Sequence, residues 1–168
     1  EELLELLQNW SLEYKLENDG NMQLYFNEKP IAQKNLRNPE VTEIVSQVAK
    51  IPALRKWMLQ KQRDSAKLGI IVMEGRDIGT VIFPEAKFKF FVTASALERA
   101  RRRMAQSNEV KEGATLEKVV AEIEERDRID SSRSEAPLKA ANDAQIINND
   151  SMTKYETAAL LADIIRKK

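Results

Sequence analysis

The chain has 168 residues, of which 42% are hydrophobic and 32% are charged, which is enough for one hydrophobic core and too few for two full domains. Lysine plus arginine (27) equals aspartate plus glutamate (27), so the net charge gives no reason to expect bulk attraction to nucleic acid or to an anionic membrane. Because the sequence contains no cysteine and no histidine, disulfides, thiol nucleophiles, imidazole bases and the usual zinc sites are excluded.

The N-terminal segment resembles neither a signal peptide nor a membrane span. No apolar run in the sequence approaches the roughly 20 residues that a membrane helix needs, and no basic segment precedes an apolar one. We therefore expect a soluble cytoplasmic protein. Residues 1–8 have the pattern of an amphipathic helix with neither an initiator methionine nor a capping residue before it, so we expect the chain to be a fragment of a larger structure.

The first third of the chain has turn and helix-start signals in close succession. Residues 11–31 alternate apolar and polar side chains on either side of Asn18-Asp19-Gly20-Asn21, which predicts a small antiparallel meander. Asn38-Pro39 combines a side-chain cap with a proline at the first helical position, and Pro52 opens a further helix that should end near Lys67.

Three short apolar runs predict buried strands. Residues 70–73 (Ile-Ile-Val-Met) form the clearest run and should be buried on both faces, whereas residues 88–92 and 144–147 are weaker candidates. Helix-start signals at Ser95 and Thr153, each with a glutamate three residues later, follow the second and third runs. This alternation of strand and helix predicts a parallel sheet with helices on its faces.

The helix predicted over residues 115–130 has an apolar stripe that becomes charged toward its end. Continuing the stripe by helical spacing reaches Arg126 or Asp127 and then Asp130, with Arg133 three residues further on. Charges on a core-facing stripe are costly unless they are paired or face a ligand cavity, so this end of the helix is a candidate polar site. An ordinary solvent-exposed pair of Arg126 and Asp130 is an equally good interpretation of the spacing.

A second candidate site directly follows the strand predicted at residues 70–73. In open parallel sheets, ligands bind at the carboxyl ends of strands, and the glycines of Glu74-Gly75-Arg76-Asp77-Ile78-Gly79-Thr80 would let the backbone approach a ligand closely. Arg76 could bind an oxyanion through two hydrogen bonds, and Asp77 could accept hydrogen bonds or orient a metal-bound water. A glycine-rich turn with a surface ion pair explains the same residues about as well.

Arginine is concentrated in one part of the chain. Seven of the twelve arginines lie between Arg99 and Arg133, and the block 99–103 alone contains four of them. A solvated basic helix face is the usual explanation of such a block. Because a polar connection and a second charged helix follow it, the block also fits a lid that closes over phosphates. Ser46 and Arg55, taken by themselves, are unremarkable surface positions.

Together these segments resemble the bacterial cytidylate kinases, a branch of the nucleoside monophosphate kinase family with the P-loop fold. The matching segments lie in the family's order and cover nearly the whole chain; they are Val45-Ser46-Gln47-Val48-Ala49, Pro52-Ala53-Leu54-Arg55, residues 75–84 (GRDIGTVIFP), Ala94-Ser95, Glu98-Arg99-Ala100, Arg102-Arg103-Met104, Glu125-Arg126-Asp127 through Arg133, and Ala136-Pro137-Leu138. The resemblance implies an α/β fold, with a P-loop kinase-type parallel sheet flanked by helices and one cytidylate kinase domain over residues 1–168. A small antiparallel insert at 11–37 and a lid with its flanking helices at 99–133 would belong to that domain.

The resemblance also assigns roles to individual residues. Ser46, Arg55 and Asp77 match positions that recognise the cytosine ring, and Arg126 and Asp130 match positions that hold the pentose. The remaining matches are arginines: Arg76 and Arg133 correspond to residues near the acceptor phosphate and base, Arg102 corresponds to a lid residue that faces the transferred phosphoryl group, and Arg37 lies in the segment that leads from the insert to the acceptor site.

One family feature is missing from the sequence. The family has a glycine-rich phosphate loop that ends in lysine and serine or threonine, and none of the five glycines here is followed by lysine. The resemblance places this loop, the first strand of the sheet and an early phosphate-binding arginine before residue 1. We therefore expect the chain to be inactive alone and to be less stable than the intact enzyme, because the first strand would be central to the sheet.

For the intact protein the resemblance implies transfer of the ATP γ-phosphoryl group to CMP or dCMP, with Mg²⁺ accompanying ATP and without a covalent enzyme intermediate. We expect a monomer that binds neither nucleic acid nor membrane. Two alternatives remain: another pyrimidine monophosphate such as UMP as acceptor, and a nucleotide-binding module that has lost catalysis. RNA binding by the arginine cluster is disfavoured because residues 99–133 contain no aromatic residue on which a base could stack.

Overall fold

The N-terminal part of the molecule is a helix followed by a small antiparallel sheet. The computed structural model describes residues 2–36, 38–106 and 110–167, without the side chains at positions 4, 33, 34 and 46. Helix α1 (Glu2–Asn9) leads into three strands in the order β1 (Leu12–Leu16), β2 (Met22–Phe26) and β3 (Lys29–Pro30). The predicted meander is confirmed, and Gly20 has the positive φ of 83° that the turn between β1 and β2 requires.

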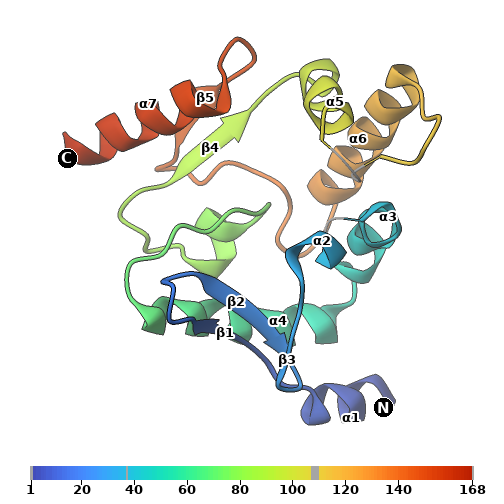
Figure 1. Cartoon of the computed structure of the whole chain (residues 1–168), viewed down its shortest axis with the longest axis vertical. Coiled ribbons are helices and arrows are strands. Elements are labelled where there is room, and N and C mark those ends of the chain that lie inside the picture. Colours follow the sequence, from blue (N-terminus) through green and yellow to red (C-terminus); the bar gives the residue numbers. More distant parts are fainter. Residues whose placement is uncertain (1, 37, 107–109, 168) are drawn as a thin grey trace.

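Aromatic contacts attach this sheet to the rest of the chain. The ring of Trp10 lies edge-on to Phe26 of β2 at 5.5 Å and to Trp57 of helix α4 (Pro52–Asp64) at 6.3 Å between ring centroids. Such edge-to-face pairs add to the stability gained from burial. In Figure 1 the β1–β3 sheet accordingly lies against α4, with α1 at the same end of the molecule.

Two helices lie between the antiparallel sheet and α4 in the sequence. They are α2 (Gln33–Leu36), which the sequence analysis did not predict, and α3 (Pro39–Val48), which it did. The carboxamide oxygen of Asn38 accepts a hydrogen bond from the backbone N–H of Val41 at 2.8 Å, so the predicted cap is present. Helix α4 begins at Pro52 as predicted, and a 3₁₀ turn over Ser65–Leu68 extends it close to the predicted end.

The prediction of a buried strand at residues 70–73 is wrong. This segment is extended but belongs to no strand of either sheet, and the relative exposure of Ile70 and Val72 is 104% and 99%. A strand buried on both faces needs neighbours, and within the described residues β4 (Phe90–Thr93) pairs only with β5 (Gln145–Asn148). The apolar run is therefore present without a partner to cover it.

A π-helical turn, Ile78–Ile82, follows the glycine-rich segment. Phe83 N–H donates to the carbonyl of Ile78 at 2.7 Å, and Arg63 of α4 anchors the turn by donating to the carbonyls of Val81 (2.9 Å) and Ile82 (3.0 Å). At Gly75 an added Cβ would come within 2.8 Å of the Ile78 side chain, so a larger residue here would clash with the turn.

The C-terminal half contains the parallel sheet. Strands β4 and β5 pair in parallel with Phe90 opposite Gln145 and Thr93 opposite Asn148, which confirms both of the weaker predictions as strands. Their expected burial is wrong, because Ile147 is the one buried residue of the two strands. Helices α5 (Ala96–Met104) and α7 (Lys154–Arg166) follow the two strands. Thr153 and Glu156 form the complete capping box predicted for α7. The hydroxyl of Ser95 caps α5, whereas its backbone N–H donates to Asp150 instead of to Glu98.

Helices α5 and α6 (Leu116–Ser131) form an antiparallel pair that we call the α5–α6 hairpin. Ala100 of α5 and Val119 of α6 are completely buried, and Ile123 completes this small core. Figure 1 shows the hairpin beside α3, away from the antiparallel sheet. The fold is thus α/β, with a parallel sheet and a small antiparallel sheet, as predicted. None of the helices in the described part of the chain combines the length and apolar character of a membrane span.

Candidate functional site

The buried carboxylate of Asp130 is the centre of the candidate site. Its side chain is 1% exposed, and three arginines approach it. Arg76 donates from Nε to Oδ2 at 3.2 Å, Arg133 pairs with Oδ1, and the Nε of Arg126 lies 3.9 Å from Oδ2. The interpretation as a solvent-exposed pair of Arg126 and Asp130 is therefore wrong, and the stripe ends in a buried polar cluster. Ligand binding at this cluster stays a prediction.

Three different segments bring these residues together. Arg126 and Asp130 occupy successive turns of α6, on the continuation of the face that buries Val119 and Ile123. Arg133 follows the end of α6, where the carbonyl of Asp130 also accepts the backbone N–H of Leu138 at 2.8 Å. Arg76 comes from the glycine-rich segment, so the two candidate sites of the sequence analysis meet at Asp130.

The positive charge around Asp130 exceeds what one carboxylate can neutralise. The buried Nε atoms of Arg126 and Arg133 have no hydrogen-bond partner within the described part of the chain. Burial lowers the pKa of Arg126, the charge of Arg76 lowers it further, and Asp130 partly reverses the effect. Desolvated guanidinium groups with free donors favour an anionic ligand, because such a ligand would restore both charge balance and hydrogen bonding.

A second ion pair is next to this cluster in the sequence, because Asp77 follows Arg76. The guanidinium of Arg55, in the first turn of α4, pairs with the carboxylate of Asp77, and the two side chains are only 18% and 12% exposed. Arg55 also donates to the carbonyl of Ala49 at 3.4 Å, just after the end of α3. Ser46 lies on α3, but its side chain is outside the described residues, as is Arg37 entirely.

Arg102 is not part of this cluster. Its guanidinium donates to the side chain of Glu98 at 3.0 Å, to the side chain and carbonyl of Asn149 at 3.1 and 2.6 Å, and to the carbonyl of Met152 at 3.2 Å. These contacts tie α5 to the connection between β5 and α7. Of the predicted site residues whose side chains the structure describes, Arg102 therefore lies away from the others, which are Arg55, Arg76, Asp77, Arg126, Asp130 and Arg133. Positions 107–109 of the predicted lid lie outside the described residues.

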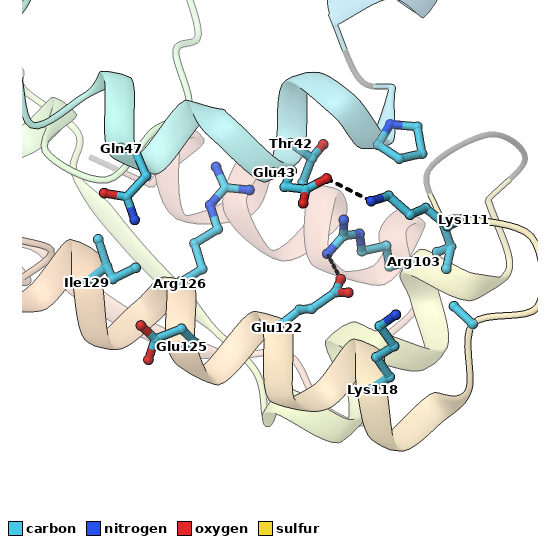
Figure 2. A pocket seen from close by; sticks show the side chains of 13 residues that line it. Thr42, Glu43, Gln47, Arg103, Lys111, Lys118, Glu122, Glu125, Arg126 and Ile129 are labelled. Atoms are coloured by element: carbon cyan, nitrogen blue, oxygen red, sulfur yellow. Dashed lines mark hydrogen bonds and ion pairs between the residues drawn. The ribbon is translucent and has the colours of Figure 1, made fainter.

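A cavity of about 370 Å³ lies between α3 and the α5–α6 hairpin, and Arg126 forms part of its wall. Figure 2 shows Arg126 reaching from α6 toward α3, and Arg103 pointing into the same space. In the sequence, Arg103 belongs to the basic block at 99–103 and to the matched segment Arg102-Arg103-Met104, and no role of its own was predicted for it. The signal that distinguishes it from Arg102 is helical position, because adjacent residues on a helix point about 100° apart.

Metal binding by protein side chains alone has no support in the site. Among the described residues, no three acidic side chains lie close enough together to hold a metal ion. A Mg²⁺ ion that accompanies a nucleotide keeps several waters and is held largely by phosphate oxygens. The residues near Asp130 are arginines, which suit the phosphates and not the cation.

Comparison with known proteins identifies the family of the chain. The family model described as cytidylate kinase matches residues 1–167. The chain belongs to the cytidylate kinase family. A cytidylate kinase from Desulforamulus reducens is 50% identical over 134 residues, which are 80% of this chain and 60% of that protein. A cytidylate kinase from Flavobacterium johnsoniae is 37% identical over 166 residues, which are 98% of this chain and 72% of that protein.

A third relative is named as a bifunctional protein. The bifunctional pantoate ligase/cytidylate kinase from Prochlorococcus marinus is 42% identical over 170 residues, which are 99% of this chain and 32% of that protein. The chain thus spans 60% of the Desulforamulus protein and about a third of the Prochlorococcus protein. Membership of the cytidylate kinase family makes the arginine cluster around Asp130 a candidate nucleotide site.

Proposed function

We propose that the protein to which this chain belongs transfers a phosphoryl group from ATP to CMP or dCMP, and that the described residues form the acceptor side of the site. The observation that carries this proposal is the convergence of Arg76, Arg126 and Arg133 on one buried aspartate, with two guanidinium Nε donors left unpaired among the described residues. A nucleoside monophosphate supplies the anionic oxygens that such donors favour.

The Arg55–Asp77 pair is proposed to select the base. Cytosine presents an exocyclic amine that a carboxylate can accept from, and its ring nitrogen and carbonyl oxygen accept from a guanidinium. Asp77 and Arg55 provide this acceptor and donor side by side, and both side chains are largely buried. Uracil presents a carbonyl where cytosine has the amine, and an oxygen placed against Asp77 would leave two acceptors facing each other. Ser46 would contribute a further hydroxyl to the base.

The residues around Asp130 are proposed to hold the sugar and the phosphate. Asp130 can accept hydrogen bonds from pentose hydroxyls while it fixes the orientation of Arg126. Arg76 and Arg133 would bind the acceptor phosphate, and Arg37 would join them. In phosphoryl transfer the protein acts mainly by positioning the reactants and by stabilising charge on the transferred group, so a preorganised set of guanidinium groups suits the reaction.

The donor side of the reaction involves elements that the sequence of 168 residues does not contain, because no glycine is followed by lysine. Mg²⁺ would enter with the ATP phosphates and balance their charge. Arg102 is proposed to face the transferred phosphoryl group only after it releases the carbonyls of Asn149 and Met152. Arg103 already points into the cavity and is the alternative for this role.

Calorimetric titration of the chain with CMP, UMP and AMP tests the acceptor proposal. We expect CMP to bind more tightly than UMP and AMP, and Asp77→Asn to reduce the preference for CMP over UMP by about tenfold, because one charge-assisted hydrogen bond to the base would be weakened. Asp143→Asn is the matched control, since this carboxylate is 67% exposed and pairs with Lys89.

A second pair of variants separates the proposed sugar and phosphate site around Asp130 from nonspecific charge. Arg126→Gln should weaken CMP binding at least tenfold, whereas Arg128→Gln, two residues along the same helix and 68% exposed, should leave it unchanged. Equal losses in both variants, or equal affinity for all three nucleotides, would contradict the proposed acceptor site. CMP binding without phosphoryl transfer to CMP by the whole protein to which this chain belongs would favour a binding module over a catalyst.

A further inference from the structure

One contact joins α3 to the α5–α6 hairpin across the cavity. The Nζ of Lys111, in the connection before α6, lies 2.7 Å from Oε2 of Glu43 on α3. The two residues are 68 positions apart in the sequence, so the contact reports how two separate parts of the fold are arranged and not a local helix preference. Figure 2 shows this ion pair at the edge of the cavity, with Arg103 and Glu122 next to it.

The charges that face each other at this edge are complementary. Glu40 and Glu43 lie on α3, whereas Lys111 and Lys118 belong to the hairpin. The hydrogen bond from Lys111 is the main reason that the pKa of Glu43 is lowered, and the charge of Lys118 contributes. The pKa of Lys111 is raised chiefly by its hydrogen bond with Glu43, with smaller effects of Glu122 and Glu40. Charge networks of this kind set the register of two surfaces.

The same cavity receives two further guanidinium groups. Arg126 and Arg103 both line it, and NH1 of Arg103 lies 3.9 Å from Oε2 of Glu122. Arg126 also belongs to the cluster around Asp130, so the cavity and the proposed acceptor site share this residue. The distance between α3 and the hairpin therefore sets how Arg103 and Arg126 face a ligand bound between them.

We propose that Glu43 and Lys111 are positioning residues that hold the α5–α6 hairpin against α3 and so determine how tightly the acceptor nucleotide is bound. Neither residue is assigned a contact with the nucleotide. This inference rests on the proposed function, since it concerns access to the same acceptor site. The arrangement of α3 and the hairpin is nevertheless measurable in the absence of any nucleotide.

The expected effect is modest because Glu43 and Lys111 are 63% and 59% exposed. Exposed ion pairs shift an equilibrium by only about two- to fivefold. Since apparent affinity scales with the fraction of molecules in the binding-competent arrangement, breaking the contact should weaken CMP binding by about the same factor. The effect should also fade at high salt, because exposed charges are screened.

The distance between α3 and α6 tests the arrangement directly. The chain contains no cysteine, so Ile44→Cys on α3 and Ala121→Cys on α6 give two unique labelling positions on exposed residues. Pulsed electron paramagnetic resonance of the nitroxide-labelled chain then reports the distribution of distances without nucleotide. We expect Glu43→Lys and Lys111→Glu each to broaden the distribution toward longer distances, and the double reversal to restore it.

The matched control is Lys67→Glu, which breaks an exposed pair of the same kind with Asp64 at the end of α4, where 2.6 Å separates the charged atoms. This variant should change neither the distance distribution nor the affinity for CMP. Far-ultraviolet circular dichroism of every variant verifies that the helices remain folded.

An unchanged distribution in both single reversals, or a double reversal that fails to restore the wild-type distribution, would overturn the inference. If the distances respond as expected while CMP does not bind, the proposed function fails and the positioning contact stands. If CMP binds to the wild type and the distances do not respond, the proposed function stands and the positioning role of Glu43 and Lys111 fails.

Discussion

The terminal nitrogen of Arg102 lies 2.6 Å from the backbone oxygen of Asn149, so helix α5 is joined to the connection between β5 and α7. The same guanidinium reaches the side chain of Asn149 at 3.1 Å and the carbonyl of Met152 at 3.2 Å. Several acceptors in different directions require the branched, planar donor set of arginine, which a lysine ammonium cannot reproduce.

Arg102→Lys should therefore destabilise the protein by about 1–2 kcal/mol, since charge-assisted hydrogen bonds are lost from a side chain that is about one-third exposed. Urea denaturation measures the change in the free energy of unfolding. Hydrogen exchange at residues 149–153 should become faster. Arg101→Lys, at a position 62% exposed and 3.9 Å from its partner Glu98, is the control and should have no measurable effect. Unchanged exchange in Arg102→Lys would contradict an anchoring role.

The exposed apolar segment at residues 70–73 gives a second prediction. Because Ile70 and Val72 are fully exposed, Ile70→Lys and Val72→Lys should each change the free energy of unfolding by less than about 0.5 kcal/mol. Ile82→Ala is the contrasting variant, because this side chain is 3% exposed and its truncation should cost about 2–5 kcal/mol. Thermal and urea denaturation of the three variants check the values. A large loss of stability in Ile70→Lys would show that the segment is buried in solution.

Local signals predicted most of the elements. The cap at Asn38, the prolines at 39 and 52 and the capping box at Thr153 act within a few residues, so they specify helix starts without knowledge of the rest of the fold. Short runs of apolar residues at 88–92 and 144–147 likewise indicated the two strands that pair. The run at 70–73 is the most apolar of the three, but pairing depends on a neighbour that no local pattern specifies.

The candidate site was predictable for a different reason. Helical spacing placed Arg126 and Asp130 on the continuation of a buried face with Arg133 three residues further on, and the glycine-rich segment supplied Arg76 as part of a second candidate site. Sequence alone left open whether these charges are buried together, because a solvent-exposed pair has the same spacing. The orientation of Arg102 away from the cavity and of Arg103 into it depends on the packing of Ala100 against α6, which is a tertiary contact.

Burial of Asp130 among three arginines predicts a strong dependence of stability on this carboxylate. Asp130→Asn removes the negative charge at the centre of the cluster and leaves the surrounding guanidinium groups to repel one another. We expect a loss of about 3 kcal/mol, at the lower end of the range for a broken buried ion pair because Arg76 and Arg126 remain partly exposed. Urea denaturation measures this loss, and Asp163→Asn, at a pair whose two side chains are 53% and 73% exposed, should be near neutral.

Binding of an anion should partly compensate this variant if the cluster is an anion site. Phosphate added to Asp130→Asn should therefore raise its melting temperature more than that of the wild type, since ligands that bind the folded state stabilise it by mass action. Equal increases in the two proteins would mean that phosphate does not bind at the arginines around Asp130.

The junction between β4 and α5 predicts a pH dependence of stability. One carboxylate oxygen of Asp150 accepts both the backbone N–H and the hydroxyl of Ser95, each at 2.8 Å. These hydrogen bonds, the backbone one first, lower the pKa of Asp150 below its ordinary value of 3.8. Because the folded-state pKa is the lower of the two, the stabilisation is present above pH 3.8 and is lost as the pH falls through the folded-state pKa.

Asp150→Asn should remove this contribution while keeping a side-chain oxygen that accepts from Ser95. The melting temperature of the wild type should therefore exceed that of the variant at neutral pH, and the difference should shrink as the pH is lowered from about 6 to about 2.5. Subtracting the two curves cancels the other carboxylates, several of which also have lowered pKa values. Asp163→Asn on α7, where the carboxylate is 53% exposed, is the control. A difference that stays constant over the whole pH range would show that ionisation of Asp150 does not stabilise the junction.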